Sequence, residues 1–336
     1  MTNGCKEKRQ QPRGLAALHF AGLEIDPPLL LAPMAGLTHS ALRRLLLELG
    51  GVGLLTTEML AAKRLPHDNP RLSPYLIRHE SERPLAYQLL LIRREDAAPA
   101  VETLHRLGAE AIDLNLGCPA PEIRRLGGGS RLMEEPAAVG RLVREVRRRT
   151  GLPLSAKIRL GEELDPRRLR DFCLMLEGEG IDLVTVHARL RGESFGRKPR
   201  WEWVARVKSW LKIPVVANGG IFSVAEAAEC LATTGADGLM IGRAAATHPW
   251  IFREIAAYCG YPPAPEPDRP ALYRRFIALL EESFPPERRL GRLKEFTHYY
   301  ARNYRFGHWL AAKVQASETM EQAVERAAEF FQQNSQ

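Results

Sequence analysis

Residues 111–119, Ala-Ile-Asp-Leu-Asn-Leu-Gly-Cys-Pro, predict a short strand that ends in a turn carrying a thiol. Isoleucine and leucines alternate with Asp113 and Asn115 at the period of a strand. The glycine interrupts the strand, and Pro119 pushes Cys118 toward an extended conformation, which places the thiol on a defined turn. Taken alone, a single cysteine is more often an inert buried residue than a reactive one. The rest of the chain has to decide between the two interpretations.

The alternation of a short apolar strand with an amphipathic helix extends from Leu18 to residue 250. Strands are predicted at 29–33, 53–57, 84–89, 111–116, 153–158, 182–187, 214–218 and 238–241. Helices are predicted near 39–49, 95–107, 137–149, 166–178, 201–211 and 223–234. Strand–helix alternation implies a parallel sheet, and eight such strands imply an α/β fold of the (β/α)₈ TIM barrel type. A hairpin from His19 to Ile25 is expected to plug the bottom of this barrel.

Local signals predict several element boundaries. Thr38 and Ser223 are candidate helix N-caps, because their hydroxyls can accept a hydrogen bond from the first turn. Pro136 and Pro166 suit the first turn of a helix. The segment 59–82 carries three prolines and is expected to be irregular.

A second, smaller domain is predicted after the barrel. Residues 261–270 contain five prolines in ten positions and cannot continue a helix. Helical periods follow at 271–284, 287–304, 307–316 and 318–333, which indicates a small helical bundle. The predicted domains are a disordered tail at 1–13, a barrel at 14–258, a linker at 259–270 and a helical domain at 271–336.

The charge pattern favours a polyanionic partner. The 336 residues carry a net charge of +8, which makes nucleic acid a more plausible partner than a membrane. Between 286 and 315, seven basic residues stand against two acidic ones, interleaved with eight aromatic or histidine residues. This pattern fits RNA better than duplex DNA, because unpaired bases stack on aromatic faces. The alternative is that about half of the aromatic residues form the core of the bundle while the arginines solvate it.

The cysteines and the apolar runs bear on the compartment. Five scattered cysteines without a Cys-x-x-Cys pair argue against a disulfide framework or a zinc site, and for a reducing cytoplasm. No apolar run is long enough to cross a bilayer, and residues 1–13 lack the apolar core of a secretory signal. We therefore expect a cytoplasmic protein without a membrane partner. We also expect it to be a monomer, although neither observation bears on the oligomeric state.

Polar or glycine residues follow each of the eight predicted strands. Barrels place their chemistry at the carboxyl ends of the strands, so these residues form the candidate site. In chain order they are Met34-Ala35-Gly36, Thr57-Glu58, Gln88, Asn115 with Cys118, Lys157 with Arg159, His187 with Arg189, Asn218-Gly219-Gly220 and Gly242-Arg243. Glycines after the last two strands expose backbone N–H groups, and together with Arg243 they predict a phosphate site.

Three of these residues suggest specific chemistry. Lys157 could be a Schiff-base nucleophile, half of a structural ion pair, or a cation that faces an anionic cofactor ring. Gln88 can donate and accept at once, as the edge of a flavin or a pyrimidine requires. His187 has no carboxylate or second histidine beside it at metal-ligand spacing, so no metal is expected.

Seven runs, taken in order along the barrel, resemble the tRNA-dihydrouridine synthases. They are Leu31-Ala-Pro-Met-Ala-Gly-Leu-Thr38, Thr57-Glu-Met59, Asp113-Leu-Asn-Leu-Gly-Cys-Pro119, Lys157-Ile-Arg-Leu-Gly161, Val186-His-Ala-Arg189, Val216-Ala-Asn-Gly-Gly220 and Met240-Ile-Gly-Arg243. The resemblance covers nearly the whole chain. The run Arg292-Leu-Lys-Glu-Phe and the triple glycine at 127–129 look most like the bacterial branch that modifies position 16 of the D-loop. Two positions depart from the family pattern: Ala188 replaces a usual glycine, and Arg200 replaces a usual acidic residue before Trp201.

The resemblance implies an FMN-dependent oxidoreductase, reduced by NADPH or NADH, that converts a D-loop uridine of tRNA to 5,6-dihydrouridine. The cofactor would supply a hydride for C6, and Cys118 would supply the proton for C5, because a thiol is protonated at neutral pH yet gives up its proton readily. The residues implied for FMN are Pro33, Met34, Gly36, Gln88, Lys157, His187, Asn218, Gly220, Gly242 and Arg243. Those implied for tRNA are Asn115, Arg159, Arg189, Arg292 and Lys294, with Arg124, Arg125 and Arg131 as candidate phosphate contacts.

Three other functions stay open at this point. The first is an FMN barrel resembling dihydroorotate dehydrogenase that acts on a free pyrimidine, which leaves the basic aromatic helical domain unexplained. The second is an RNA-binding protein that uses a barrel without catalysis, against which the complete set of strand-end residues argues. The third is a Schiff-base aldolase that acts through Lys157.

Overall fold

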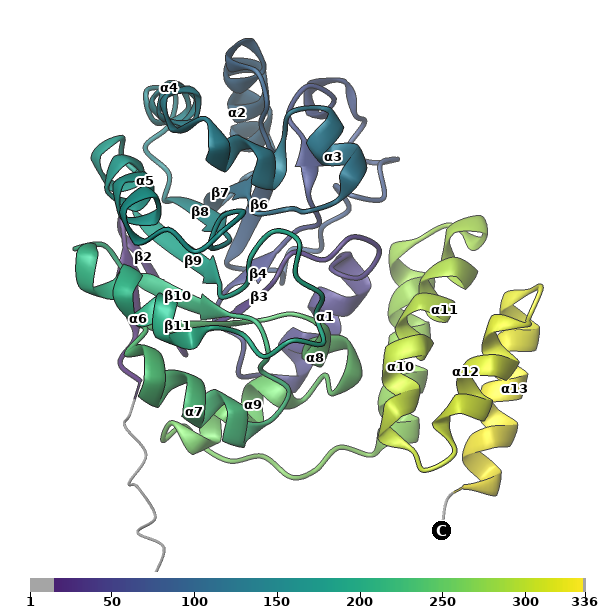
Figure 1. Ribbon diagram of the computed structural model, residues 1–336. Helices are drawn as coiled ribbons and strands as arrows, with labels where there is room; N and C mark the ends of the chain where they lie inside the picture. Colours follow the sequence, from purple (N-terminus) through teal and green to yellow (C-terminus); the bar gives the residue numbers. More distant parts are fainter. Residues whose placement is uncertain (1–14, 335–336) are drawn as a thin grey trace, which may run out of the picture.

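The computed structural model describes residues 15–334. Within them the larger part is a barrel of parallel strands surrounded by helices, and a bundle of four helices lies beside it (Figure 1). The tail predicted at 1–13 lies outside the described residues. None of the helices in the described part of the chain is long and apolar enough to span a bilayer.

Eight parallel strands form the barrel in the described chain. They are β3 (Leu29–Leu31), β4 (Leu55–Thr56), β6 (Leu85–Leu90), β7 (Ala111–Leu116), β8 (Leu154–Ile158), β9 (Leu183–His187), β10 (Val215–Asn218) and β11 (Gly238–Ile241). Hydrogen bonds connect them in the order β3-β11-β10-β9-β8-β7-β6-β4. A bridge between Leu30 and Leu54 joins the two ends of this order, and the Leu31 N–H donates to the Leu54 carbonyl at 2.9 Å. The ring is closed, which confirms the predicted (β/α)₈ barrel.

Strand β7 shows how the alternating pattern is used. Ile112, Leu114 and Leu116 belong to the large core that lies beneath the surrounding helices. Successive side chains of a strand point to opposite faces, so Asp113 and Asn115 point toward the barrel axis. All six residues of the strand are buried. The polar residues of the pattern therefore lie inside the barrel and not in solvent.

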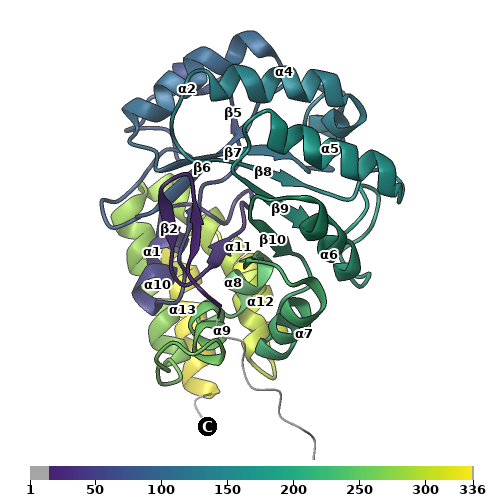
Figure 2. The same ribbon diagram turned by 90° about the vertical axis from the view of Figure 1, so that its left-hand side faces the viewer.

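The predicted hairpin closes the bottom of the barrel. It consists of β1 (Leu18–Phe20) and β2 (Leu23–Ile25), which pair antiparallel and cross one end of the barrel (Figure 2). Its buried side chains share a small apolar cluster with inward-facing barrel residues such as Ala86 and Val216. Gly53 makes room for this approach, because a Cβ there would lie 2.0 Å from the carbonyl oxygen of Pro27.

Helices surround the barrel. At the predicted places lie α1 (Ser40–Leu49), α2 (Ala97–Arg106), α4 (Pro136–Arg147), α5 (Pro166–Gly178), α6 (Trp201–Trp210) and α7 (Val224–Thr234). The sequence analysis did not predict the shorter helices α3 (Pro121–Arg125), α8 (Arg243–Thr247) and α9 (Ile251–Tyr258). Short 3₁₀ turns occur at η1 (Leu65–His67), η2 (Arg94–Asp96) and η3 (Gly129–Glu134).

The helix caps confirm one prediction and correct another. Ser223 caps α7 by accepting a hydrogen bond from the Glu226 N–H at 3.2 Å. Thr38 is not the N-cap of α1, which is His39. The Thr38 hydroxyl is instead occupied by the backbone of Met34, which it contacts through both the N–H at 3.0 Å and the carbonyl at 3.1 Å. The prediction failed because a competing local hydrogen bond is available four residues earlier.

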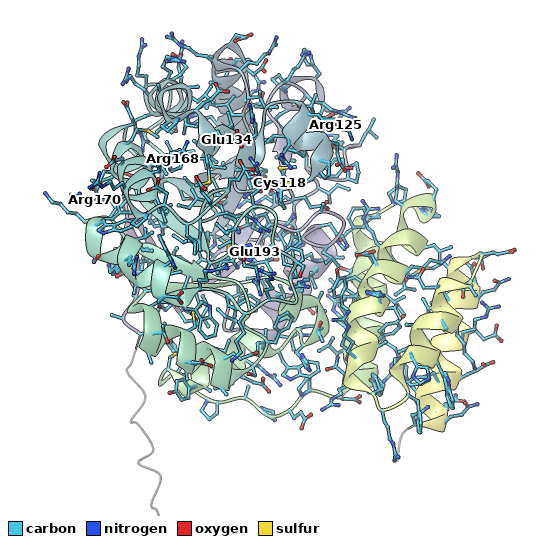
Figure 3. The ribbon with its side chains drawn as sticks, viewed as in Figure 1. Cys118, Arg125, Glu134, Arg168, Arg170 and Glu193 are labelled. Carbon is cyan, nitrogen blue, oxygen red and sulfur yellow. The ribbon has the colours of Figure 1, made fainter. Side chains whose placement is uncertain are left out.

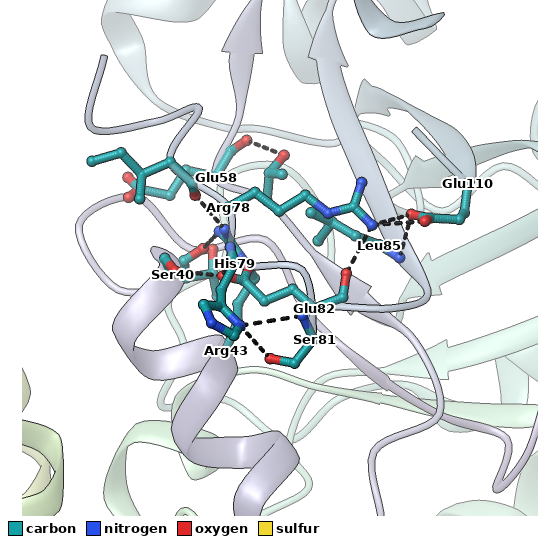
Figure 4. A network of polar contacts seen from close by, with 12 residues as sticks. Ser40, Arg43, Glu58, Arg78, His79, Ser81, Glu82, Leu85 and Glu110 are labelled. Carbon is teal, nitrogen blue, oxygen red and sulfur yellow. Dashed lines mark hydrogen bonds and ion pairs between the residues drawn. The ribbon is translucent and has the colours of Figure 1, made fainter. Parts of the chain in front are cut away.

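A buried ion pair stabilises the region where the barrel lacks a helix. The irregular segment after β4 contains only β5 (Leu60–Ala61) and η1 before β6 begins. Its Glu82 is fully buried and accepts from Arg43 Nε at 2.5 Å, from the His79 N–H at 2.8 Å, and from the Ser40 hydroxyl (Figure 4). Arg43 also donates to the carbonyls of Thr38 and Ile77, at 2.6 and 2.9 Å. The pair therefore ties α1 to the segment that replaces a helix.

The helical domain consists of α10 (Arg269–Ser283), α11 (Arg289–Tyr300), α12 (Gly307–Gln315) and α13 (Met320–Gln333), with 3₁₀ turns η4 (Pro286–Arg288) and η5 (Ala301–Asn303). Helix α10 packs on α1, and α11 packs on α8. The core of the helical domain is aromatic. The rings of Phe276 and Phe296 stack at 3.8 Å between centroids, and those of Phe296 and Tyr300 at 5.1 Å. Part of the aromatic pattern is therefore core.

The linker is two residues shorter than predicted. Asp268 caps α10 by accepting a hydrogen bond from the Ala271 N–H at 3.0 Å, so the helix begins at Arg269. Pro270 lies in the first helical turn, where a missing N–H costs nothing. A proline count alone does not distinguish a linker residue from a proline at a helix start.

We expect Glu82→Gln to lower the free energy of unfolding by about 3–5 kcal/mol, because it leaves the Arg43 guanidinium buried without a counter-charge. Urea denaturation followed by circular dichroism measures the change. Glu102→Gln is the control: it removes an exposed pair with Arg106 and should cost less than about 1 kcal/mol. Equal effects of the two substitutions would contradict a structural role for the buried pair.

Candidate active site

The carboxyl ends of the strands surround a cavity of about 240 Å³. Most residues predicted for the site line it: Pro33, Met34, Gln88, Asn115, Cys118, Lys157, Arg159, His187, Arg189, Asn218, Gly220, Gly242 and Arg243. They come from seven strands that are distant in sequence. Closure of the barrel brings them together.

A chain of hydrogen bonds crosses neighbouring strands and ends at the cysteine turn. Strand register places Gln88 and Ser155 on either side of Asp113. The Ser155 hydroxyl donates to Asp113 Oδ1 at 2.6 Å, and Gln88 Nε2 donates to Oδ2 at 2.7 Å. Asn115 Nδ2 donates to Gln88 Oε1 at 2.8 Å. Asn115 Oδ1 in turn accepts from the Cys118 N–H at 2.9 Å. The chain anchors the backbone of the cysteine to a buried carboxylate.

Asp113 is a residue whose role the sequence analysis missed. Burial raises the pKa of its carboxyl group, while hydrogen bonds from Ser155 and Gln88 and the charge of Lys157 lower it. Since Asp113 accepts from Gln88 Nε2, the amide of Gln88 can have only one orientation. The alternation of polar and apolar residues in β7 could have indicated this role, because an acidic residue on a buried strand requires hydrogen-bond donors.

The thiol of Cys118 lies at the cavity wall and not in packed core. Cys118 is partly buried, whereas Cys173, Cys230 and Cys259 are fully buried. Its carbonyl accepts from the Ser130 N–H at 2.9 Å, which holds the turn against the glycine-rich segment. Gly129 has a φ of +59°, and a Cβ there would lie 2.5 Å from the Cys118 carbonyl oxygen. Figure 3 shows Cys118 beside α3, the helix that carries Arg125.

Lys157 is a partly buried cation that a hydrogen bond holds in place. Its Nζ donates to Asn218 Oδ1 at 2.8 Å, and Asn218 Nδ2 donates to the Met240 carbonyl at 2.7 Å. Burial lowers the pKa of Lys157 to about 8, an effect that the Asp113 carboxylate opposes and Arg159 reinforces. No carboxylate contacts the Lys157 ammonium in the described residues, so it is not half of a direct ion pair.

His187 is neutral at neutral pH. Burial lowers its pKa well below the usual value, and the charges of four cations, Lys157, Arg159, Arg189 and Arg243, lower it further. Arg189 Nη1 lies 3.0 Å from His187 Nε2. A guanidinium can only donate, so Nε2 is the acceptor and the ring proton is assigned to Nδ1. The cavity therefore offers a neutral donor within a strongly positive environment.

The glycine turns after β10 and β11 fit a phosphate group. Gly219 and Gly220 have φ values of +104° and +75°, and a Cβ on Gly219 would lie 2.6 Å from the His187 ring. Within residues 15–334, the N–H groups of Gly219, Gly220 and Gly242 donate to no protein acceptor. Free amides beside the Arg243 guanidinium suit an anion. The predicted phosphate site is thus chemically reasonable.

A loop after β9 covers part of the cavity with Phe195, which the sequence analysis did not single out. The Phe195 ring is half exposed and stacks on His187 at 5.9 Å between centroids, with the Arg243 guanidinium 4.2 Å from its centre. Arg189 donates to the loop carbonyls of Phe195 and Arg197, at 3.2 and 2.6 Å. Most of the Arg189 donors are thus committed to the loop. No local pattern in the sequence marks Phe195.

Arg200, which stands where the family pattern has an acidic residue, connects the two ends of this loop. It forms an ion pair with Glu193, whose carboxylate also accepts from the Leu190 N–H at 2.8 Å. The hydrogen bond from Arg200 is the main reason that the pKa of Glu193 is lowered to about 2. The departure from the family pattern is therefore compensated within the loop itself.

Of the predicted strand-end residues, Gly36, Thr57 and Glu58 do not line the cavity, and neither do Arg292 and Lys294, which were predicted to contact tRNA. The Gly36 N–H donates to Glu58 Oε2 at 2.6 Å, beside the helical domain. Arg292 lies on α11 with its guanidinium 4.2 Å from the centre of the Phe284 ring. Lys294 is on the same helix and half buried. Sequence order could not show that α11 packs against the barrel beside, and not inside, the cavity. No cluster of His, Cys, Asp or Glu that could hold a metal ion occurs among the described residues.

Comparisons with known structures support the fold. A 2-naphthoyl-CoA reductase complex superposes with a TM-score of 0.54 at 11% identity, over 73% of this chain and 52% of the other. Histamine dehydrogenase from Rhizobium sp. 4-9 superposes with a TM-score of 0.56 at 13% identity, over 79% and 51%. Together with the strand-end cavity, this defines the class of protein: an α/β-barrel with its site at the carboxyl face.

Sequence comparisons define the family. The model of the dihydrouridine synthase (Dus) family matches residues 30–335. A tRNA-dihydrouridine(16) synthase of Pseudomonas putida is 35% identical over 289 residues, which are 82% of this chain and 88% of the relative. A tRNA-dihydrouridine synthase B of Shigella flexneri is 32% identical over 311 residues, 90% and 96%. The chain belongs to the dihydrouridine synthase family, and is accordingly an oxidoreductase of the flavoenzyme class.

We expect Lys157→Met to stabilise the flavin-free protein by about 1–3 kcal/mol at pH 7, because it removes the cost of burying a charge. A folded-state pKa of about 8, below the ordinary 10.5, means that the unfolded chain binds the proton more tightly. Wild-type stability should therefore rise between these two pH values, whereas the variant should lack this rise. Urea unfolding at several pH values measures both effects. Lys212→Met, at an exposed site, is the control. If the stability of Lys157→Met varied with pH in the same way as that of the wild type, the expectation would be refuted.

Proposed function

We propose that this protein reduces a D-loop uridine of tRNA to 5,6-dihydrouridine, with FMN as the cofactor and NADPH or NADH as the reductant. One observation carries the proposal: a partly buried thiol shares one cavity with free glycine amides, a partly buried lysine and three arginines. A flat, anionic, phosphate-bearing cofactor matches the amides and cations. A proton donor to a second flat ring matches the thiol.

The cofactor would be held mainly by the cationic half of the cavity. The amides of Gly219, Gly220 and Gly242, with the Arg243 guanidinium, would bind its phosphate. Lys157 and the Nδ1–H of His187 would face the part of the ring system that becomes negative on reduction. Pro33, Met34 and Gln88 would border the ring. When bound, FMN supplies the hydride that C6 of uracil receives.

Cys118 would complete the reduction by donating its thiol proton to C5. The hydrogen-bond chain from Asp113 through Gln88 and Asn115 holds the backbone of Cys118 while it leaves the sulfur free at the cavity wall. Asn115 also lines the cavity, so its amide is available to orient the uracil. Arg159 keeps part of its guanidinium free, because only Nη1 is bound, to the Leu190 carbonyl at 2.8 Å.

A uridine within folded tRNA must leave its loop to reach this cavity, at a cost of a few kcal/mol. Phosphate contacts would offset that cost and make binding strongly salt-dependent. Arg124 and Arg125 on α3 and Arg131 on η3 lie on the elements next to the cysteine turn. Arg292 and Lys294 of the helical domain are further candidates for tRNA contact. We expect the protein to act as a monomer in the cytoplasm, where tRNA is modified.

We propose position 16 as the modified uridine. The Pseudomonas putida relative, which covers 82% of this chain, is named for that position. Mapping dihydrouridine in tRNA from cells that lack the protein, and from the same cells after re-expression, tests the proposal. Loss and recovery at one D-loop position would support it, whereas unchanged tRNA together with reduction of free uracil derivatives would favour the free-pyrimidine alternative.

A second function has one observation in its favour. The lowered pKa of Lys157 suits a Schiff-base nucleophile as well as a cofactor contact. Borohydride trapping in the presence of an aldehyde tests this function. We expect no trapped adduct at Lys157, because Asn218 holds its Nζ in place.

We expect Cys118→Ala to bind FMN with unchanged affinity and to lose at least about 100-fold in the rate of dihydrouridine formation, since removal of a general acid typically costs 10²–10⁴-fold. Flavin absorbance measures binding, and single-turnover assays with tRNA measure the rate. Cys230→Ala, in a helix away from the cavity, is the matched control and should retain the wild-type rate. A Cys118→Ala enzyme with wild-type turnover would exclude the thiol as the acid.

A further inference from the structure

The helical domain exposes two stacked aromatic rings, Phe306 and Trp309. Their centroids lie 5.0 Å apart and their planes differ by 13°. Phe306 is 37% exposed and Trp309 is 55% exposed, while the neighbouring Phe296 and Tyr300 are completely buried. The pair sits at the start of α12, where Leu310 and Val314 already provide the packing against the bundle. The two rings are therefore not required to fill the core.

Two exposed arginines lie near this part of the helical domain, one of them against the Phe306 ring. The Arg305 guanidinium lies 5.4 Å from the centre of the Phe306 ring, and that of Arg302 lies 5.5 Å from the centre of the Tyr299 ring. Both arginines are exposed, and within the described residues neither forms an ion pair with a carboxylate. The ring centroids of His308 and Trp309 lie 5.4 Å apart, with the planes at 64°. The surface thus combines flat apolar faces with positive charge that forms no ion pair with any acidic group of residues 15–334.

This surface is connected to the cavity. Helix α11, which precedes η5 and α12, packs on α8, and α8 begins at Arg243 of the cavity wall. Arg302 and Tyr299 are close enough to Arg243 to act on its pKa: burial lowers the pKa most, Tyr299 raises it and the charge of Arg302 lowers it. Positive groups therefore continue from the phosphate end of the cavity across η5 to the exposed rings.

We infer that Phe306 and Trp309 form a stacking platform for an unpaired nucleobase of RNA, with Arg302 and Arg305 binding the adjacent phosphates. The inference rests on the proposed function in that the RNA is tRNA, but the base concerned is one other than the uridine that enters the cavity. Every base has a flat π face, so stacking on an aromatic ring tolerates any sequence and adds to phosphate contacts. Positively charged side chains without acidic ion-pair partners fit a polyanionic nucleic acid. They fit a protein partner or a second copy of this basic chain less well.

The platform predicts separable effects of two kinds of substitution. Trp309→Ala should weaken tRNA binding by about 5- to 100-fold at every salt concentration, the range expected for the loss of one stacked base. Arg302→Gln and Arg305→Gln should each reduce the slope of log affinity against log salt by about 1. Trp309→Phe should retain most of the affinity. Arg170→Gln is the charge control, because this exposed arginine on α5 lies on the side of the barrel away from the helical domain (Figure 3).

Fluorescence anisotropy with labelled tRNA, a single-stranded oligonucleotide and a duplex of the same sequence measures these effects directly. Trp309→Ala should weaken the binding of the tRNA and of the single-stranded oligonucleotide, and it should leave the binding of the duplex unchanged. Flavin content and the oxidation of NADPH by an artificial electron acceptor should stay at wild-type values in all variants, which separates the platform from the cavity.

The outcomes distinguish this inference from the proposed function. A wild-type protein that binds RNA through Trp309 but forms no dihydrouridine would contradict the proposed function alone. Wild-type tRNA affinity in Trp309→Ala would overturn the platform alone. Concentration-dependent self-association of the wild type that Trp309→Ala abolishes would also overturn it, because the rings would then belong to an interface between two copies.

Discussion

The position of the thiol depends on one buried carboxylate. Asp113 lies inside the barrel, where an ionised group without partners would be prohibitively costly. Donors from the two adjacent strands, Gln88 and Ser155, offset this cost, and they are in place only because the strands pair in one register. The same hydrogen bonds orient Gln88 toward Asn115 and thereby hold the turn of Cys118. Barrel closure, side-chain orientation and the location of the reactive sulfur are thus consequences of one pairing pattern.

The rest of the cavity is organised by an excess of positive charge. Lys157 and three arginines converge on it, while Asp113 is buried beneath it and Glu193 is engaged with Arg200. Such an arrangement is unfavourable in the protein alone: burial lowers the pKa values of Lys157 and His187, and the neighbouring cations lower them further. A bound anion relieves that cost, so affinity for a phosphate-bearing ligand and a lower stability without it have the same origin. The neutral His187 and the free glycine amides complete a surface that is suited to an anion.

The helical domain shows how one sequence pattern can serve two purposes. Its interleaved arginines and aromatic residues predicted an RNA-binding surface, with the packing of a core as the alternative. The structure divides them: Phe296 and Tyr300 fill the core, whereas Phe306 and Trp309 remain exposed beside free arginines. Spacing along a helix does not settle this division, because the orientation of α12 depends on where the bundle packs against α1 and α8.

The amino-acid sequence was sufficient to predict the barrel, the order of its strands and most of the cavity wall, because hydrophobic periodicity and strand-end residues are local signals and a closed parallel barrel has few alternative arrangements. It did not reveal the short helices α3, α8 and α9, the capping residue of α1, or the role of Phe195, which depend on partners distant along the chain. It also grouped Gly36 with the cavity residues. The structure places Gly36 outside the cavity, with its N–H bound to Glu58 where α11 packs against the barrel, and no local pattern encodes that contact between surfaces.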